Sequence, residues 1–202
     1  MTIRVGIFVF PEVEVLDFAG PYEVFTTATR VARRLDPAAA DPFATFTFAE
    51  TAAPFRVRAG LRALPDHAFG AHPVIDLLIV PGGVVTAELD KPAVVERIAA
   101  LAAQARIAAA VCTGAFLLGR AGLLDGLQAT THREDIADLQ RAFPQARIVA
   151  DSRWVDAGRI VTSGGISAGI DMSLHLVERL AGRELALRTA RQMEYRWEET
   201  VS

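Results

Sequence analysis

The sequence has very little cysteine: Cys112 is the single cysteine among 202 residues, so no disulfide can form within the chain. This composition is typical of a protein from a reducing, cytoplasmic compartment. The sequence also lacks an excess of one charge, because 21 Lys and Arg residues stand against 24 Asp and Glu residues. The densest basic spot is the pair Arg33-Arg34. We therefore expect neither nucleic acid nor an anionic membrane surface as a partner.

Long hydrophobic runs are absent as well. The apolar runs, such as residues 107–111, are far shorter than the ~20 residues that a membrane-spanning helix needs. Acidic Glu12 and Glu14 follow the apolar N-terminal stretch at once, which is not the pattern of a signal peptide. Hydrophobic residues nevertheless make up 51% of the chain, enough for a sizeable core. We expect one soluble domain over residues 1–202.

Short apolar segments alternate with segments of helical periodicity. Strands are expected at residues 3–10, 45–48, 75–80, 106–111, 128–131 and 147–150, with one or two more within 55–64 and a hairpin-like pair at 154–155 and 160–162. Helices are expected from about Pro21, from Pro92, over 114–121 and 134–142, after 163–165 and over 184–195, with residues 191–199 forming a solvated helix face. This order predicts an α/β fold with a mostly parallel sheet between layers of helices.

Unusual residues follow four of the expected strands. They are Leu16-Asp17, Pro81-Gly82-Gly83, Val111-Cys112-Thr113-Gly114 and Ser163-Gly164-Gly165. In open parallel sheets, ligands bind at the carboxyl ends of the strands. We therefore expect these four segments to meet at one edge of the sheet.

Cys112 is the strongest candidate for chemistry. It lies between an apolar strand and a glycine-containing helix start, the position of the nucleophile in the strand–turn–helix elbow of α/β hydrolases. A helix N-terminus beside the sulfur is expected to lower the thiol pKa, and the following N–H of Thr113 could face an oxyanion. The alternative is a small, buried and inert cysteine. The position favours the functional interpretation.

Asp17, Gly82 and Gly83 each allow two interpretations. Asp17 could cap the helix expected near Pro21, or could place a carboxyl beside the sulfur, where burial next to negative charge would raise its pKa. The glycine pair could form an ordinary tight turn, or could bring a backbone N–H to a developing anion beside that of Thr113. The residues alone leave these choices open.

Among the four histidines, His132 follows a strand-like segment and could reach the edge that holds Cys112. A helix-capping or surface role is nearly as well supported. We expect His67 and His72 to be solvated loop residues and His175 to be a packed histidine. The histidines lack metal-ligand spacing, so no metal is expected.

Taken together, the sequence resembles the DJ-1/PfpI superfamily. The matching stretches, which cover nearly the whole chain in order, are VGIFVFPEVEVLDFAGPYEVF, DLLIVPGG, AVCTGAFLLGRAGLLDG, ATTH, RWVDAGRIVTSGGISAGIDMSLHLVERL and RQMEY. The resemblance implies a flavodoxin-like fold similar to that of class I glutamine amidotransferases. Within the superfamily the sequence looks most like the isonitrile hydratases and the input domains of AraC-type regulators. Because the sequence stops at Ser202, soon after RQMEY, a stand-alone enzyme is expected.

The resemblance also implies roles for single residues. Cys112 would be the nucleophile and Asp17 its carboxyl partner, with His132 nearby. The N–H groups of Gly83 and Thr113 would form the oxyanion site. Arg133, where relatives often carry tryptophan, and Ala110, where true amidotransferases carry glycine, depart from the pattern.

These resemblances imply hydration of a small-molecule isonitrile to a formamide, without a cofactor. The alternatives are a glyoxalase-like or amidase-like cysteine activity, and a non-catalytic redox or ligand sensor. A cytoplasmic homodimer is expected from the family.

Overall fold

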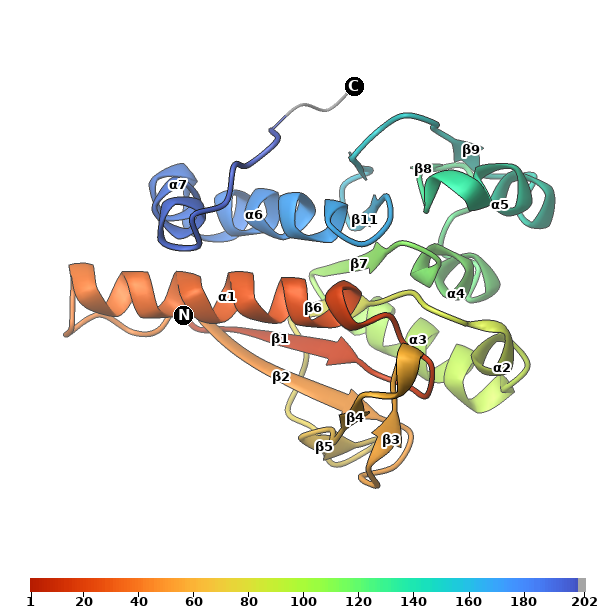
Figure 1. The fold of residues 1–202 in the computed structure, drawn as a ribbon, viewed down its shortest axis with the longest axis horizontal. Helices are drawn as coiled ribbons and strands as arrows, with labels where there is room; N and C mark the ends of the chain where they lie inside the picture. The colour runs from red at the N-terminus through yellow and green to blue at the C-terminus, as the bar shows by residue number, and fades with distance from the viewer. Residues whose placement is uncertain (200–202) are drawn as a thin grey trace.

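The structure of the protein is a computed structural model that describes residues 1–199. At its centre is a seven-stranded sheet with the strand order β10-β11-β7-β6-β1-β2-β5 (Figure 1). The strands are β1 (Ile3–Phe8), β2 (Phe43–Ala49), β5 (His67–Ala68), β6 (Leu77–Val80), β7 (Ile107–Val111), β10 (Trp154–Asp156) and β11 (Ile160–Ser163). Neighbouring strands are parallel except β10 and β11, which form the expected hairpin. The predicted α/β fold is therefore confirmed.

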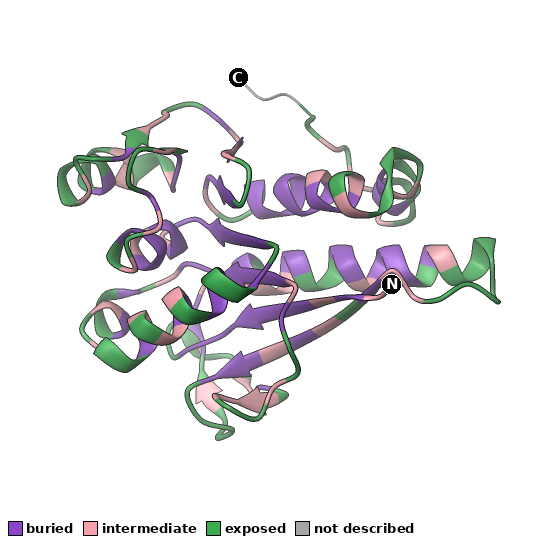
Figure 2. Cartoon of the chain, turned by 180° about the vertical axis from the view of Figure 1, so that it is seen from behind, coloured by how far each residue is buried: buried purple, intermediate pink, exposed green. Residues whose placement is uncertain are grey.

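Helices cover both faces of this sheet. They are α1 (Val15–Leu35), α2 (Thr86–Leu89), α3 (Pro92–Gln104), α4 (Gly114–Arg120), α5 (Ile136–Ala142), α6 (Ala168–Ala181) and α7 (Arg183–Gln192). Short elements complete the fold: the strand pairs β3 (Phe55–Arg56) with β4 (Arg62–Ala63) and β8 (Gln128–Ala129) with β9 (Arg147–Ile148), and the 3₁₀ turns η1 (Arg58–Gly60) and η2 (Arg133–Asp135). Helices α1, α6 and α7 lie on one face, whereas α3 and α4 lie on the other (Figures 1 and 2).

Strand β6 shows why its sequence is a continuous apolar run. All four of its residues, Leu77–Val80, are completely buried. Side chains alternate across a strand, so Leu78 and Val80 pack in the core beneath α3 and α4. Leu77 and Ile79 point the other way and pack beneath α1 and α6. A strand covered on both faces needs apolar residues at every position.

Helix α1 begins earlier than predicted. Its first residue is Val15, and the side chain of Glu14 accepts a hydrogen bond from the Val15 N–H at 3.2 Å. Pro21 therefore lies inside the helix instead of opening it. Proline has no N–H, so the helix loses the hydrogen bond to the carbonyl of Asp17 but continues past it. As a result, Asp17 is a first-turn helical residue and not the helix cap.

The C-terminal segment also differs from the prediction. Helix α7 ends at Gln192, and residues 193–199, here called the C-terminal strap, run back beside α6 (Figure 1). The side chains of Tyr195 and Trp197 pack against the core on that face of the sheet. The predicted solvated helix face over residues 191–199 is confirmed only for Arg191 and Gln192, which are exposed residues of α7. It is wrong for the strap, which is tied down by polar contacts that sequence periodicity does not reveal.

Within residues 1–199, the helices are too short or too polar to cross a lipid bilayer.

Candidate active site

Cys112 occupies a sharp turn between β7 and α4, here called the cysteine elbow (Val111–Gly114). Its φ angle is 57°, which is uncommon for any residue other than glycine. Such strain persists only when neighbouring groups hold it. The N–H of Cys112 donates to the carbonyls of Ser163 at 3.1 Å and Gly164 at 3.3 Å, and its own carbonyl accepts from Thr131 Oγ1 at 2.8 Å.

Gly114 is required by the same geometry. A Cβ atom at this position would lie 2.1 Å from the carbonyl oxygen of Val80, closer than real Cβ atoms approach. The glycine lets α4 begin directly against the end of β6. The expected strand–turn–helix context of Cys112 is therefore present in the structure.

Asp17 reaches the elbow from α1. Its side chain is completely buried and interacts with the thiol of Cys112. Its Oδ2 accepts a hydrogen bond from the N–H of Gly82 at 3.1 Å. Its Oδ1 is buried without a hydrogen-bond partner among the described residues, an arrangement that is costly for an ionised carboxylate.

Burial dominates the protonation of this pair. It raises the pKa of Asp17 to about 7, although the N–H of Gly82 acts in the opposite direction. Burial also raises the pKa of Cys112 to about 12, and the negative charge of Asp17 adds to this effect. The prediction of a lowered thiol pKa is wrong: the N–H of Thr113 does lower it, but the loss of solvent around the sulfur is the larger effect.

The two acidic groups are therefore coupled. Because ionised Asp17 raises the pKa of Cys112, a proton on Asp17 makes the thiolate easier to form. The elbow can thus hold one proton on either the carboxyl or the sulfur, and the pair can deliver it to a substrate.

The two glycines after β6 bring their backbone close to Cys112 and Asp17. Gly83 has a φ angle of 135°, and a Cβ there would lie 2.3 Å from the carbonyl oxygen of Glu12. A Cβ on Gly82 would lie 2.6 Å from the backbone nitrogen of Thr113. Glycine is needed at both positions, at Gly83 for its φ angle and at Gly82 for the close approach.

The two predicted oxyanion donors have different partners in the structure. The N–H of Gly83 donates to Thr113 Oγ1 at 2.9 Å, and that hydroxyl also lies 2.9 Å from the Gly83 carbonyl oxygen. The N–H of Thr113 interacts with the sulfur of Cys112. The Thr113 hydroxyl must therefore move aside before the Gly83 N–H can bind another anion.

A cleft of about 660 Å³ opens beside the elbow. It is lined by Glu14, Arg58, Gly83, Val84, Val85, Thr86, Leu89, Cys112, Thr113, Phe116, His132, Glu134, Asp135, Asp138 and Ile166. One wall, formed by η2 and α5, carries three of the acidic residues. The other wall carries the ion pair of Arg58 with Glu14, whose Nη1 and Oε2 atoms lie 3.2 Å apart. The cleft is thus broad and charged.

Sequence reasoning missed Arg58. It lies on η1, far from every motif, and nothing in its local sequence distinguishes it from the other arginines. Its backbone N–H donates to the carbonyl of Val13 at 3.0 Å, which holds η1 against the loop before α1. This contact and the hydrogen bond from the Glu12 N–H to the carbonyl of Arg56 at 2.9 Å bring the guanidinium to the cleft.

His132 fits both of its sequence interpretations. Its ring lines the cleft with Cys112, and its Nδ1 atom accepts from the N–H of Glu134 at 3.3 Å, which caps η2. Gly165 makes room for the ring, because a Cβ there would lie 2.0 Å from the His132 Cδ2 atom. The neighbouring Arg133 instead lines a separate cavity of about 350 Å³ behind His132.

The remaining histidines have structural surroundings. His67 and His72 are half-buried and pack against Phe46, so the prediction of solvated loop residues is wrong. His175 stacks on Trp154 with ring centroids 3.9 Å apart, as its predicted packed role requires. Among residues 1–199 there is no group of three His, Cys, Asp or Glu residues placed to hold a metal ion.

Fold and site together define a class: a flavodoxin-like α/β protein with a cysteine and a buried carboxyl at a strained strand–helix turn. A model of the DJ-1/PfpI family matches residues 3–179, and the chain belongs to this family. Over 199 residues it is 35% identical to isonitrile hydratase from Pseudomonas putida, a match that covers 96% of this chain and 79% of the hydratase.

Other relatives have different descriptions. The chain is 41% identical over 130 residues to the HTH-type transcriptional regulator GbdR of Pseudomonas aeruginosa, but the match covers 63% of this chain and only 34% of the regulator. The crystal structure of a ThiJ/PfpI family protein from Pseudomonas syringae superposes with a TM-score of 0.85 at 26% identity, covering 98% of this chain and 77% of that one. The family therefore contains more than one kind of function.

Proposed function

We propose that the protein is a cysteine-dependent enzyme that hydrates an isonitrile to an N-substituted formamide. The observation that carries this proposal is the contact between Cys112 and the completely buried Asp17, at an elbow that opens into a cleft. The similarity to an isonitrile hydratase over 96% of the chain supports the choice of substrate. No metal or organic cofactor enters the proposed reaction.

In the first step, the sulfur of Cys112 forms a bond to the terminal carbon of the isonitrile. Asp17 delivers the single shared proton to that same carbon, which leaves a neutral thioimidate. A pKa near 7 suits this transfer, because a carboxyl with this pKa still holds a proton at neutral pH and releases it readily. Burial is therefore what fits Asp17 for the task.

In the second step, water adds to the thioimidate carbon. Asp17, now ionised, or His132 accepts one proton from the water and passes it to the nitrogen of the substrate, which leaves a neutral tetrahedral adduct. The carbon–sulfur bond then breaks as the remaining hydroxyl proton passes to the sulfur, which releases the formamide and returns the thiol. The N–H groups of Thr113 and Gly83 would donate to the developing negative charge, the latter once the Thr113 hydroxyl has moved.

Purified protein with cyclohexyl isocyanide and with methylglyoxal tests this proposal. We expect formamide from the first compound and no lactate from the second. Cys112→Ala and Asp17→Ala should each abolish formamide production, whereas Cys112→Ala should keep its circular dichroism spectrum. No turnover of several isonitriles by folded wild-type protein would reject the proposed function.

One observation favours a second candidate, hydrolysis of an amide or peptide. The cleft of about 660 Å³ is larger and more charged than a short apolar isonitrile requires. Release of ammonia or of a new amino group from amide substrates, dependent on Cys112, would support this activity. A redox sensor is less favoured, because burial and a raised pKa both protect the thiol from oxidation.

We further propose that the protein acts as a cytoplasmic homodimer. Leu16 and Tyr22 on α1 are each 37% exposed, an apolar surface that a second copy could cover. Light scattering during size-exclusion chromatography measures the mass directly, and a mass of one chain would contradict the dimer.

A further inference from the structure

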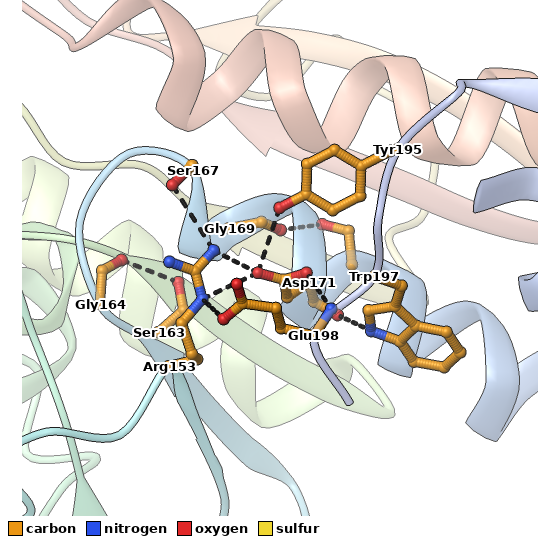
Figure 3. A network of polar contacts seen from close by, with 10 residues as sticks. Arg153, Ser163, Gly164, Ser167, Gly169, Asp171, Tyr195, Trp197 and Glu198 are labelled. Atoms are coloured by element: carbon orange, nitrogen blue, oxygen red, sulfur yellow. Dashed lines mark hydrogen bonds and ion pairs between the residues drawn. The ribbon is translucent and has the colours of Figure 1, made fainter. Parts of the chain in front are cut away.

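A second completely buried aspartate, Asp171, lies in the first turn of α6 and has no role in the proposed reaction. It is surrounded by donors, a guanidinium among them (Figure 3). Its Oδ2 accepts from Arg153 Nε at 2.9 Å, from Arg153 Nη2 and from the Tyr195 hydroxyl at 3.2 Å. Its Oδ1 accepts from the backbone N–H of Glu198 at 3.0 Å. The buried charge is thus compensated by two separate segments.

One of these segments is the C-terminal strap. In addition to Tyr195 and Glu198, Trp197 contributes its indole N–H, which donates to the backbone carbonyl of Asp171 at 3.2 Å (Figure 3). Glu198 also places its Oε2 atom 3.4 Å from Arg153 Nε. Burial, with the charge of Asp171, raises the pKa of Tyr195 to about 12, so the phenol remains a hydrogen-bond donor. The strap therefore completes the surroundings of both charged groups.

The other segment leads from Arg153 to the cysteine elbow. The backbone carbonyl of Arg153 accepts from the N–H of Gly164 at 2.9 Å. The carbonyl of Gly164 in turn accepts from the N–H of Cys112 at 3.3 Å. Two backbone hydrogen bonds thus connect the residue that Asp171 holds with the residue that carries the sulfur.

The hydrogen bonds of the Cys112 N–H have a particular importance. They go to the carbonyls of Ser163 and Gly164, and they hold a residue whose φ angle of 57° is unfavourable without such support. An element that fixes the position of Gly164 therefore also fixes the strained turn. The side chain of Arg153 is such an element, because Asp171 anchors it to α6 while its own backbone holds Gly164.

We propose that Asp171 and Arg153, together with the C-terminal strap, are positioning residues that hold the cysteine elbow in its strained conformation. They touch neither the substrate nor the sulfur. Their effect passes through the carbonyl of Gly164 to the N–H of Cys112. The inference rests on the role of Cys112 as the reactive group, and it does not depend on which substrate is converted.

Alkylation of Cys112 by iodoacetamide tests the proposal, because Cys112 is the single cysteine of the chain and mass spectrometry reports it alone. The rate is measured against pH in wild-type protein and in Asp171→Asn, Arg153→Lys and Tyr195→Phe. A loosened elbow lets water reach the sulfur and lowers its pKa, which increases the thiolate fraction. We expect alkylation of Asp171→Asn near neutral pH to be about threefold to tenfold faster, with a smaller change in the same direction in the other two variants.

Tyr22→Phe is the matched control, since it removes the other tyrosine of the chain, whose hydroxyl has no hydrogen bond to the strap among residues 1–199. It should have the wild-type profile. If Asp171→Asn lowers the unfolding midpoint but its alkylation profile coincides with that of wild type, the role is structural only and the proposal is overturned. Tyr195→Phe keeps the test usable if Asp171→Asn fails to fold. An alkylation profile of Tyr195→Phe equal to that of Tyr22→Phe would exclude a positioning role for the strap.

This readout is independent of the proposed function. Iodoacetamide requires no isonitrile site, so a protein without isonitrile turnover would fail the proposed function while leaving the alkylation result meaningful. Conversely, an active enzyme in which all three variants alkylate as wild type would keep the function and remove the positioning role.

Discussion

Replacing Asp17 by asparagine should show how much folding stability is lost when the buried carboxyl ionises. Burial raises its pKa from an ordinary value of 3.8 to about 7. A shift of roughly three pKa units corresponds to about 4 kcal/mol of preference for the protonated form. The pKa of Asp17 is higher in the folded chain than in the unfolded chain. The contribution of the protonated carboxyl to the free energy of unfolding is therefore complete below the unfolded pKa and is lost as the pH rises through about 7. Asparagine cannot ionise and avoids the loss.

The assay is urea unfolding of wild type and Asp17→Asn, followed by circular dichroism between about pH 4 and about pH 8. The difference between the two free energies of unfolding should shift in favour of the variant by about 4 kcal/mol across this interval. Cys112 does not interfere, because its pKa of about 12 keeps it protonated throughout. Asp125→Asn, at an exposed position, is the control for a general effect of losing a carboxyl. A difference that stays flat would refute the argument that burial controls Asp17.

Three further predictions concern the same site. Glu14→Gln removes a negative charge that raises the pKa of Asp17, so that pKa should fall. The difference in unfolding free energy between Glu14→Gln and Glu14→Gln/Asp17→Asn should then change with pH around a lower midpoint than the difference between wild type and Asp17→Asn. An equal midpoint for the two pairs contradicts this. Gly114→Ala forces a Cβ against the Val80 carbonyl and should cost about 1–3 kcal/mol in urea unfolding, whereas an unchanged midpoint would show that the helix can shift freely. Thr113→Val removes the acceptor of the Gly83 N–H and should cost about 1 kcal/mol while accelerating hydrogen exchange at Gly83; unchanged exchange would place that N–H elsewhere.

The sequence predicted the elbow well because its determinants are local. An apolar strand followed by cysteine and then glycine restricts the chain to a strand, a sharp turn and a helix start. The convergence of the elbow with the glycine pair then follows from parallel topology, since β6 and β7 are neighbours and end at the same edge. Contact with Asp17 needed one further fact, the position of α1 beside β1.

The start of α1 was not predictable from Pro21 alone. Proline is common at a first helical position, and that rule correctly placed Pro92 at the start of α3. In α1, a buried helix face that includes Gly20 before Pro21, and Val24 and Phe25 after it, stabilises the helix on both sides of the proline. Tertiary packing therefore outweighed the missing hydrogen bond, and the helix extends back to include Asp17.

The raised thiol pKa was missed for a related reason. A helix N-terminus beside a cysteine is visible in the sequence, but the degree of burial is not. Cys112 is 7% exposed, and the cost of removing water from a charged sulfur grows with burial in a way that local sequence cannot reveal. Arg58 and the C-terminal strap were missed because each is placed by contacts with distant segments.

Asp17 and Asp171 show how surroundings assign different tasks to one residue type. Both are completely buried in the first turn of a helix, and both lie within a few hydrogen bonds of the elbow. Asp171 meets a guanidinium, a phenol and a backbone N–H, so its charge is compensated and it can anchor the chain. Asp17 interacts with the backbone of Gly82 and Ile166 and with the thiol of Cys112, none of them charged, and its Oδ1 has no hydrogen-bond partner of normal geometry among residues 1–199, so burial favours its proton instead. The poorly satisfied carboxyl is the one suited to proton transfer, and the well satisfied one is suited to holding the elbow in place.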